Sequence, residues 1–452
     1  MNKIFILLGF AMLSSVGMAQ QNQKYNFTLE QAIDFALDSN YTAINARRDI
    51  AIAIKKKWET TAGGLPQLDA NISYQNNLKQ PTTLLPGEIA GGDPGSFVPV
   101  IFGTKQNATI GATLTQLIFD GSYLVGLQAA KTFLDYSENA EEKTQLEVRK
   151  GVINAYGSVL LSKELIKIFE LNKINLEKNL LETKAFYENG FTEEESVEQL
   201  EITLINLETQ LKNSKRTLII AQQMFNLALG IDVESKVDML DNLDSLTQEN
   251  ISLEFLKENI NIKDNIDYKI ASNFTKQRIL ELKLEKSYSI PNIAAFVNYG
   301  TQANNDAFNF FSNDQKWYQS SLLGVSLNIP ILSSGLRSAR TQQARIALEK
   351  AETNLTEAYQ RILLEINTAK NNYRFAIEIY NNNKKNLDLS ERVEKKNEIK
   401  FSEGLSTSFD LRTAQIQLYT AQQNYFEAML RVITTKADLE TVLNTPQLKA
   451  TN

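Results

Sequence analysis

The segment Gly404–Val442, GLSTSFDLRTAQIQLYTAQQNYFEAMLRVITTKADLETV, decides the fold of this chain. After its glycine, apolar and small residues recur at alternating steps of three and four positions: Leu411, Ala414, Leu418, Ala421, Tyr425, Ala428, Val432, Thr435, Leu439 and Val442. This spacing is a heptad seam, which is typical of helices that pack along each other in a coiled coil. Gly404 is the only glycine after Gly335, and it therefore predicts the turn of a long helical hairpin.

A second stretch repeats the pattern. After Gly190 a seam with the same steps runs through Val197, Leu200, Leu204, Leu207, Leu211, Ser214, Leu218, Ala221, Phe225 and Ala228. Gly190 precedes Gly404 by 214 positions, and each seam begins seven positions after its glycine. We infer a diverged duplication with hairpin turns at Gly190 and Gly404. Residues 100–290 and 331–445 contain no proline, so long helices can run through both tracts.

A strand pair is predicted ahead of the long helices in each repeat. The sequence GLPQLDANISY at 64–74 matches SIPNIAAFVNY at 289–299 with a constant offset of 225. We expect junctions between helix and strand at Pro66, Pro291 and Pro330. Apolar and polar residues alternate along three of the four strands, as they do in a strand between lipid and a wet lumen. The fourth is mixed, because Phe296 falls on its polar side.

Polar, turn-rich segments at about 80–104 and about 302–316 join the strands of each pair, and we expect both to be exposed loops. Tyr74, Tyr299, Trp317 and Tyr318 fall near strand ends. They form either an interfacial aromatic girdle or ordinary packing contacts. Four strands cannot close a conducting barrel, which needs at least about eight, so we expect copies of the chain to associate.

The ends of the chain complete the domain organisation. Residues 1–19 read as a secretory signal peptide, with a charged start, an apolar stretch from Ile4 to Leu13 and a small-residue site at Gly17-Met18-Ala19. The alternative is that the segment is not cleaved and remains as a membrane anchor. A helix needs about 20 apolar residues to cross a membrane, and this apolar stretch is shorter. We then expect a first repeat at 20–230, an inter-repeat segment at 231–264, a second repeat at 265–445 and a short tail at 446–452.

Composition excludes several classes of function. The 452 residues include no Cys and no His, which excludes disulfides, thiol nucleophiles, histidine bases and common zinc sites. The scattered carboxylates form no convergent catalytic set, so we predict no enzyme activity, no cofactor and no metal. The net charge of -6, without a basic cluster, argues against a nucleic-acid partner.

Several short motifs occur in a characteristic order. A short amphipathic helix, TLEQAIDFAL at 28–37, precedes the first strand pair; LIFDG at 117–121 leads into the first hairpin, and IPILSSG at 329–335 leads into the second. In this order the chain resembles the TolC-like outer membrane efflux proteins over nearly its whole mature length. The resemblance implies a mainly α fold with a small β portion, built as two tandem repeats of long coiled-coil hairpins plus four strands.

The resemblance also implies an assembly and a function. Three copies would form an α-barrel continuous with a 12-stranded outer-membrane β-barrel, with the helical body in the periplasm. The implied partners are a periplasmic adaptor protein, an inner-membrane transporter and outer membrane lipid. The implied function is the passive exit duct of a tripartite efflux or type I secretion system. The alternative is a secreted coiled-coil scaffold without channel activity, which would leave the signal peptide and the alternating strands together unexplained.

The resemblance places the hairpin turns at a periplasmic entrance and Asp410 at the position of an acid ring. A second acid one helical turn later is replaced by Thr413 here, and the residues of the family's closing link are replaced by Ser406 and Phe401, so that link is absent or rebuilt. Acidic residues also crowd the first turn, at Glu193, Glu194 and Glu195. Three copies would form a negative rim that attracts cations. The alternative is that these acids only cap or solvate helix N-termini.

Overall fold

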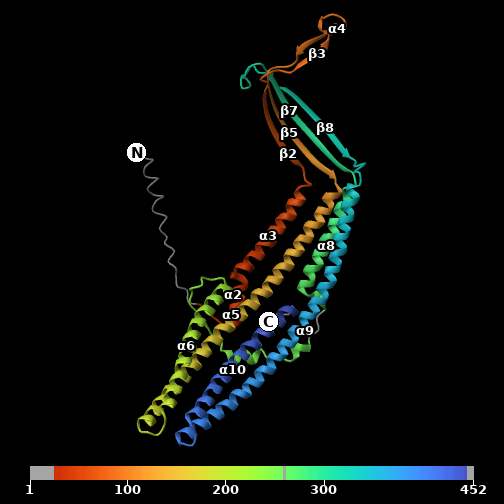
Figure 1. Ribbon diagram of the computed structural model, residues 1–452. Helices are drawn as coiled ribbons and strands as arrows, with labels where there is room; N and C mark the ends of the chain where they lie inside the picture. Colours follow the sequence, from red (N-terminus) through yellow and green to blue (C-terminus); the bar gives the residue numbers. More distant parts are fainter. Residues whose placement is uncertain (1–24, 258–260, 445–452) are drawn as a thin grey trace, which may run out of the picture. The chain divides into compact units, whose positions relative to one another are not determined.

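The computed structural model describes residues 25–257 and 261–444 (Figure 1). The expected signal peptide at 1–19 and tail at 446–452 lie outside the described residues. The chain forms two compact units. Among the described residues, the helical unit comprises those up to Arg48, those within Asn139–Ile270 and those from Glu357 onward. The sheet unit comprises Asp49–Glu138 and Ala271–Thr356. The chain is mainly helical with a smaller β portion, which confirms that part of the predicted fold class.

Two long hairpins dominate the helical unit. α5 (Gly121–Glu188) and α6 (Glu194–Leu229) form the first hairpin, and α9 (Leu336–Ser402) and α10 (Ser408–Leu443) form the second. α5 and α9 begin in the sheet unit. The core contains fully buried side chains from all four helices, among them Tyr156, Phe225, Tyr373 and Ile433. None of the helices in the described ranges has a stretch long and apolar enough to cross a membrane.

α10 buries more of its surface than its heptad seam predicts. Most of the predicted seam is buried, including Leu411, Ala414 and Leu418. A second buried row follows at intervals of seven: Ser408, Gln415, Gln422, Met429, Lys436 and Leu443. The second row exists because α10 contacts α6 and α7, and also hydrogen-bonds α5 through Asn172 Nδ2 and Gln422 Oε1, 2.8 Å apart. A helix with neighbours on several sides buries more than one stripe, including polar residues.

The inter-repeat segment is built from short elements. It contains β6 (Val237–Met239), α7 (Leu243–Glu249) and 3-10 turns at Glu254–Lys257 and Ile262–Asp264, and α8 (Ile266–Ser287) follows. β6 pairs in parallel with β1 (Tyr25–Phe27), directly before α2 (Leu29–Ser39). The Tyr156 hydroxyl lies 2.9 Å from Asp241 Oδ2 and 3.1 Å from the carbonyl oxygen of Phe27. These bonds attach the carboxyl ends of the two parallel strands to α5.

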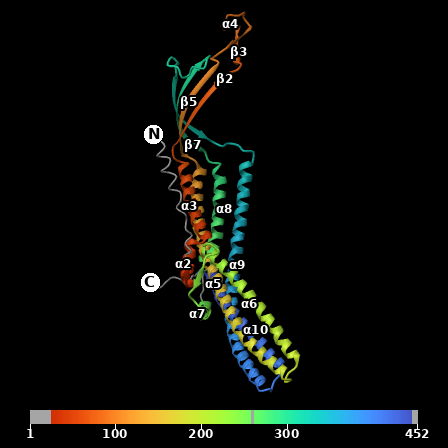
Figure 2. The same cartoon turned by 90° about the vertical axis from the view of Figure 1, so that its left-hand side faces the viewer.

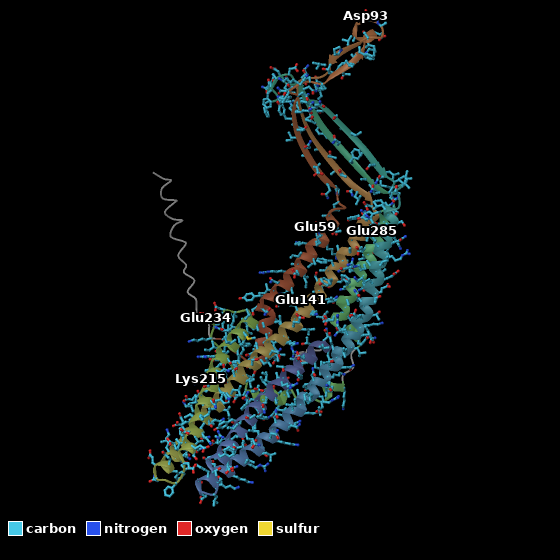
Figure 3. All side chains as sticks on the ribbon, viewed as in Figure 1. Glu59, Asp93, Glu141, Lys215, Glu234 and Glu285 are labelled. Atoms are coloured by element: carbon cyan, nitrogen blue, oxygen red, sulfur yellow. The ribbon has the colours of Figure 1, made fainter. Side chains whose placement is uncertain are left out.

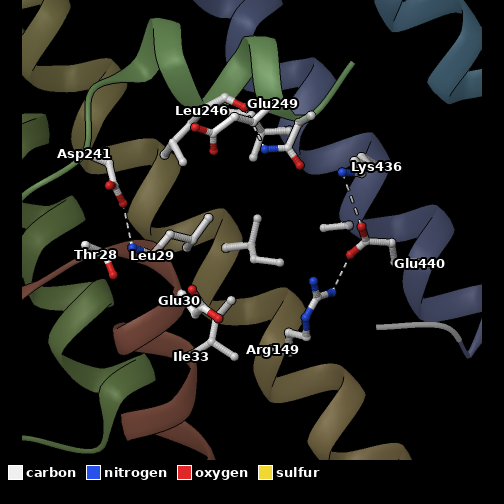
Figure 4. Close-up of a pocket in the computed structure, with 14 residues that line it drawn as sticks. Thr28, Leu29, Glu30, Ile33, Arg149, Asp241, Leu246, Glu249, Lys436 and Glu440 are labelled. Atoms are coloured by element: carbon white, nitrogen blue, oxygen red, sulfur yellow. Dashed lines mark hydrogen bonds and ion pairs between the residues drawn. The ribbon is translucent and has the colours of Figure 1, made fainter. Parts of the chain in front are cut away.

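A cavity of about 410 Å³ lies in the helical unit among α2, α5, α7 and α10 (Figure 4). On its wall Arg149 Nη1 lies 2.5 Å from Glu440 Oε2, and Lys436 Nζ lies 3.6 Å from Glu440 Oε1. All three side chains are buried. Burial lowers the pKa of the Lys436 ammonium, although Glu440 opposes this shift. The three residues form a buried ionic cluster between the two repeats. α2 lines another side of the cavity, where the Leu29 amide donates to Asp241 Oδ2 at 2.6 Å.

The sheet unit contains one open antiparallel sheet with the order β2-β5-β7-β8. Its strands are β2 (Gln67–Asn76), β5 (Gln106–Phe119), β7 (Asn292–Asn305) and β8 (Tyr318–Asn328). α3 (Tyr41–Ala62) ends shortly before β2, and α8 ends shortly before β7. The long β5–β7 pairing joins the strand pairs of the two repeats. β2 and β8 are edge strands, each with one neighbour in this sheet.

The loop expected at 80–104 is more ordered than its prolines and glycines suggest. It contains β3 (Thr82–Pro86) and β4 (Phe97–Ile101), an antiparallel pair with the short helix α4 (Gly87–Ala90) at its turn (Figure 2). Asp93 lies at the far end of this hairpin (Figure 3). The strand sequences TTLLP and FVPVI contain β-branched and aromatic residues that favour strands, and a two-stranded ribbon tolerates their prolines. Because prolines and glycines dominate this segment, its sequence did not predict the two short strands.

Candidate functional site

One face of the sheet is mostly apolar, and we call it the apolar sheet face. Its register aligns Leu68, Leu114, Val297 and Leu323 in one row across the four strands. Other members are Ala70, Ile72, Tyr74, Ile110, Ala112, Tyr299, Val325 and Leu327. Ile72 is 77% exposed and Leu323 is 73% exposed, so most of this face has no covering layer within the unit. Exposed apolar area of this extent marks a surface that contacts another protein or lipid.

The opposite face of the sheet is polar. Asn298 Nδ2 donates to Thr113 Oγ1 at 2.8 Å, and Asn107 Nδ2 donates to Asn304 Oδ1 at 2.7 Å. Leu322, which pairs with Asn298, and Phe296 are apolar exceptions on this face. The sequence singled out Phe296. It pairs with Gly324 in the register of β7 and β8, and a Cβ atom at Gly324 would lie only 2.5 Å from Phe296 Cζ. The glycine therefore provides the space in which the Phe296 ring lies against β8.

The predicted junction prolines lie between helices and strands. Pro66 and Pro291 directly precede β2 and β7, and Pro330 lies between β8 and α9. The sequence did not reveal the role of Arg337 at the third junction. Its Nη1 donates to the Pro330 carbonyl oxygen at 2.9 Å, and its Nη2 donates to the Ile331 carbonyl oxygen at 3.2 Å. The guanidinium group thus holds the turn that leads into α9.

The two hairpin turns share one backbone geometry. Gly190 has φ 74° and Gly404 has φ 69°, which is the left-handed region that favours glycine. In the first turn the Phe191 amide donates to the Phe186 carbonyl oxygen at 2.9 Å, and in the second the Leu405 amide donates to the Lys400 carbonyl oxygen at 2.7 Å. Each turn is a Schellman-type helix end, and the bonds correspond at the offset of 214.

Asp410 lies in the first turn of α10, where it takes part in a capping box with Thr407. Asp410 Oδ2 accepts hydrogen bonds from Thr407 Oγ1 at 2.7 Å and from the Thr407 amide at 3.1 Å, and the Asp410 amide donates to Thr407 Oγ1 at 3.2 Å. The Thr407 hydroxyl, then its amide, and the charge of Lys400 lower the pKa of Asp410. The side chain is exposed and keeps its negative charge at neutral pH.

The glutamates of the first turn are exposed but differ in their surroundings. Glu193 is the N-cap residue of α6, without a side-chain capping bond, and Glu194 and Glu195 follow in the first helical turn. Glu195 Oε1 accepts a hydrogen bond from Gln199 Nε2 at 2.8 Å. Within the described ranges, no group of three or more acidic side chains is placed to hold a metal ion.

The two hairpin tips contact each other. Ser408 Oγ donates to Ser196 Oγ at 2.8 Å, and the rings of Phe186 and Phe401 meet edge to face with centroids 6.3 Å apart. A pocket of about 740 Å³ lies between the tips. Its lining includes Glu193 and Ser406 but not Asp410, Glu194 or Glu195. The structure thus brings only one of the four predicted entrance acids into this pocket.

The sequence did not predict the contacts between the tips, although Phe401 is one of the residues that replace the family's closing link. Ser196 aligns with Asp410 at the repeat offset, and Phe401 aligns with Tyr187. The side chains that meet across the tips are not the ones that correspond in the repeat. The repeat offset shows which positions of the two hairpins are equivalent. Contacts between the hairpins depend instead on which side-chain surfaces fit together, so the sequence offered no signal for these contacts.

Comparison with known proteins agrees with this geometry. Residues 281–445 match the family model described as outer membrane efflux protein. Outer membrane protein TolC of Vibrio cholerae serotype O1 is 23% identical over 353 residues, which cover 74% of this chain and 76% of that protein.

Solved structures share the fold over most of the chain. CusC aligns with a TM-score of 0.74 and 16% identity, covering 93% of this chain and 92% of CusC. VceC from Vibrio cholerae aligns with a TM-score of 0.71 and 14% identity, covering 92% and 96%. The CmeC outer membrane channel of Campylobacter jejuni aligns with a TM-score of 0.71 and 15% identity, covering 92% and 85%. At these identities the structural likeness shows the fold.

Proposed function

The chain is related to the TolC-like outer membrane efflux proteins, and from this premise we propose that it is the exit duct of a tripartite efflux or type I secretion system. It is a protein of the cell outer membrane with a helical body in the periplasm. In this function it conducts substrates passively from a periplasmic adaptor and an inner-membrane transporter to the outside. It performs no catalysis.

The observation that carries the proposal is the four-stranded sheet with an exposed apolar face, a polar face and two open edges. Long edge strands invite pairing with another chain. β2 and β8 lie at opposite edges of the same antiparallel sheet, so β8 of one copy can pair with β2 of the next. Three copies joined in this way close a sheet of twelve strands, with the apolar sheet face toward lipid and the polar face toward the lumen. We therefore propose a homotrimer.

The hairpin tips are proposed as the periplasmic entrance of the duct. Asp410 supplies a fixed negative charge there, because its side chain is exposed and its pKa is lowered. Glu193, Glu194 and Glu195 add to this charge around the first turn. The capping role of Asp410 is compatible with this proposal, since a carboxylate that accepts bonds on one side still presents its charge to the solvent.

A pair of adjacent substitutions tests the membrane placement of the sheet. Ile72 and Asn71 are neighbours on β2 whose side chains point to opposite faces. We expect Ile72→Lys to abolish stable insertion into the outer membrane, because a lysine facing lipid costs about 2–4 kcal/mol near the bilayer midplane. Asn71→Lys, the matched control, should insert normally. Membrane fractionation and light scattering of the detergent-extracted protein measure both.

The outcomes separate the duct from the scaffold. A trimer that resists extraction with high salt, and conducts ions in planar bilayers, supports the duct. A monomer that washes off membranes without detergent supports the coiled-coil scaffold. Equal behaviour of Ile72→Lys and Asn71→Lys would contradict a lipid-facing apolar sheet face.

A further inference from the structure

The loop between β7 and β8 folds back onto the apolar sheet face. Phe310 attaches the loop to the sheet. It is 6% exposed and packs with Ala108 and Ala303 in a small core. The register places Tyr74, Ala108 and Ala303 in one row across β2, β5 and β7, so Phe310 lies on the apolar side of the sheet. Trp317 also packs against Phe310, with its ring centroid 6.4 Å from that of Phe310.

The loop reaches β2, the far edge strand. Tyr74 contacts the ring of Phe310 at 5.8 Å and the ring of Phe308 at 5.4 Å, measured between centroids, both in edge-to-face geometry. Figure 1 shows the loop at the end of the sheet where β2 ends and β8 begins. The Tyr74 hydroxyl lies 3.1 Å from Gln106 Oε1, so the polar end of this side chain is satisfied while its ring packs against the loop.

Two aromatic side chains of the loop face outward. Phe308 is 61% exposed and Phe311 is 90% exposed, and their ring centroids are 6.1 Å apart. Together with Tyr74 they form an apolar patch that continues the exposed apolar sheet face at its loop end. If that face contacts lipid, as proposed above, a continuous extension of it on the same side meets the boundary between the acyl chains and the headgroups. Aromatic side chains are favoured at this depth.

We propose that the β7–β8 loop is a membrane anchor whose partner is a lipid surface, with Phe308 and Phe311 inserted at the level of the lipid headgroups. Phe310 and Trp317 hold the loop on the sheet, and Phe308 and Phe311 make the lipid contact. The inference rests on the proposed function, since it requires the apolar sheet face to lie in a bilayer. The inference adds the β7–β8 loop, which lies outside the strands, to the surface that contacts lipid.

Fluorescence quenching by brominated lipid tests the anchor. The chain has two tryptophans, Trp58 and Trp317, so Trp58→Phe with Trp317→Phe gives a background without tryptophan that keeps a ring beside Phe310. Single probes are then introduced as Phe311→Trp in the loop, Leu323→Trp on the apolar sheet face and Asn71→Trp on the polar face. The full-length protein is reconstituted into phosphatidylcholine vesicles whose acyl chains carry no bromine, bromine near the headgroup end, or bromine near the middle of the chain.

We expect brominated lipid to quench most of the emission of the Phe311→Trp and Leu323→Trp probes and little of the emission of the Asn71→Trp probe. A quenched Leu323→Trp probe beside an unquenched Phe311→Trp probe would overturn the anchor and leave the proposed duct standing. An unquenched Leu323→Trp probe would remove both proposals, because the sheet would then not lie in lipid. Phe308→Trp is a second loop probe that reports on the same patch if Phe311→Trp does not fold.

Discussion

Arg149 and Glu440 are 291 positions apart in the chain, yet their side chains form a buried ion pair in which Arg149 Nη1 lies 2.5 Å from Glu440 Oε2. The pair connects α5 in the first repeat with α10 in the second. Lys436 lies one helical turn before Glu440 and contacts its other carboxylate oxygen. Two cations thus share one buried carboxylate between the two hairpins.

Loss of Glu440 should destabilise the helical unit strongly. We expect Glu440→Gln to lower the free energy of unfolding by about 3–5 kcal/mol, because it leaves two buried cations without their carboxylate. Denaturant unfolding followed by circular dichroism measures the change. The exposed pair Lys150–Asp438, 2.7 Å apart between the same two helices, provides the control. Asp438→Asn should cost less than about 1 kcal/mol, since exposed ion pairs contribute little. Equal losses would show that burial of Glu440 does not matter.

Lys436 should make stability depend on pH in the alkaline range. Burial lowers the pKa of its ammonium group in the folded protein below the usual 10.5. Between the two pKa values the unfolded chain binds more protons than the folded chain, so this residue makes the free energy of unfolding rise with pH. Lys436→Met removes this dependence. We subtract the free energy of unfolding of the wild type from that of Lys436→Met. We expect this difference to decrease as the pH rises from neutral toward 10.5, because only the wild type becomes more stable through this residue. A difference that stays constant in denaturant unfolding at several pH values would contradict the shift.

The charge and the capping role of Asp410 can be separated by two substitutions. Asp410→Asn removes the charge but keeps an oxygen that can accept from Thr407, so we expect the cation preference in planar bilayers to fall while stability changes little. Thr407→Ala removes the capping partner but keeps the charge. It should keep the cation preference and lower stability by about 0.5–2 kcal/mol. An unchanged cation preference in Asp410→Asn would remove this residue from the pore.

The charge of Asp410 should also persist at low pH. The pKa of this carboxyl group is lowered from its usual 3.8, so the carboxylate is still largely ionised at pH 4. Its capping contribution is present above the unfolded pKa and is lost as the pH falls through the folded pKa. We expect the cation preference due to Asp410 to remain when bilayer measurements are moved from pH 7 to pH 4. Its disappearance at pH 4 would indicate a raised pKa and would contradict the lowered one.

Gly324 should be required for the packing of Phe296. A side chain at position 324 would collide with the Phe296 ring. We expect Gly324→Val to reduce the yield of assembled protein, measured as the fraction that migrates as an oligomer in unheated gels. Adding Phe296→Ala to Gly324→Val should restore assembly, because it removes the ring. Gly111→Val on β5 is the matched control, since a Cβ there would meet its nearest atom, the Tyr299 carbonyl oxygen, only at 3.9 Å.

The periodic elements were accessible from the sequence. The heptad seam at Leu411 and Leu418 and the glycine turns at 190 and 404 reflect local rules, because helix periodicity and left-handed glycine ends depend on residues close in the chain. The alternation in β2 likewise showed which side chains share a face. The sequence did not predict the hairpin β3–β4, because its strands are short and its composition is dominated by turn residues.

The sequence by itself determined the two helical hairpins and the four strands of the main sheet with their apolar and polar sides, since each follows from spacing within a short segment. Only the tertiary structure decided which distant groups meet: Arg149 with Glu440, Ser196 with Ser408, and Phe310 with the row that begins at Tyr74. Local periodicity states which face of an element is buried, but it does not state which element covers that face. That choice depends on the simultaneous packing of all the elements, and no short stretch of sequence records it.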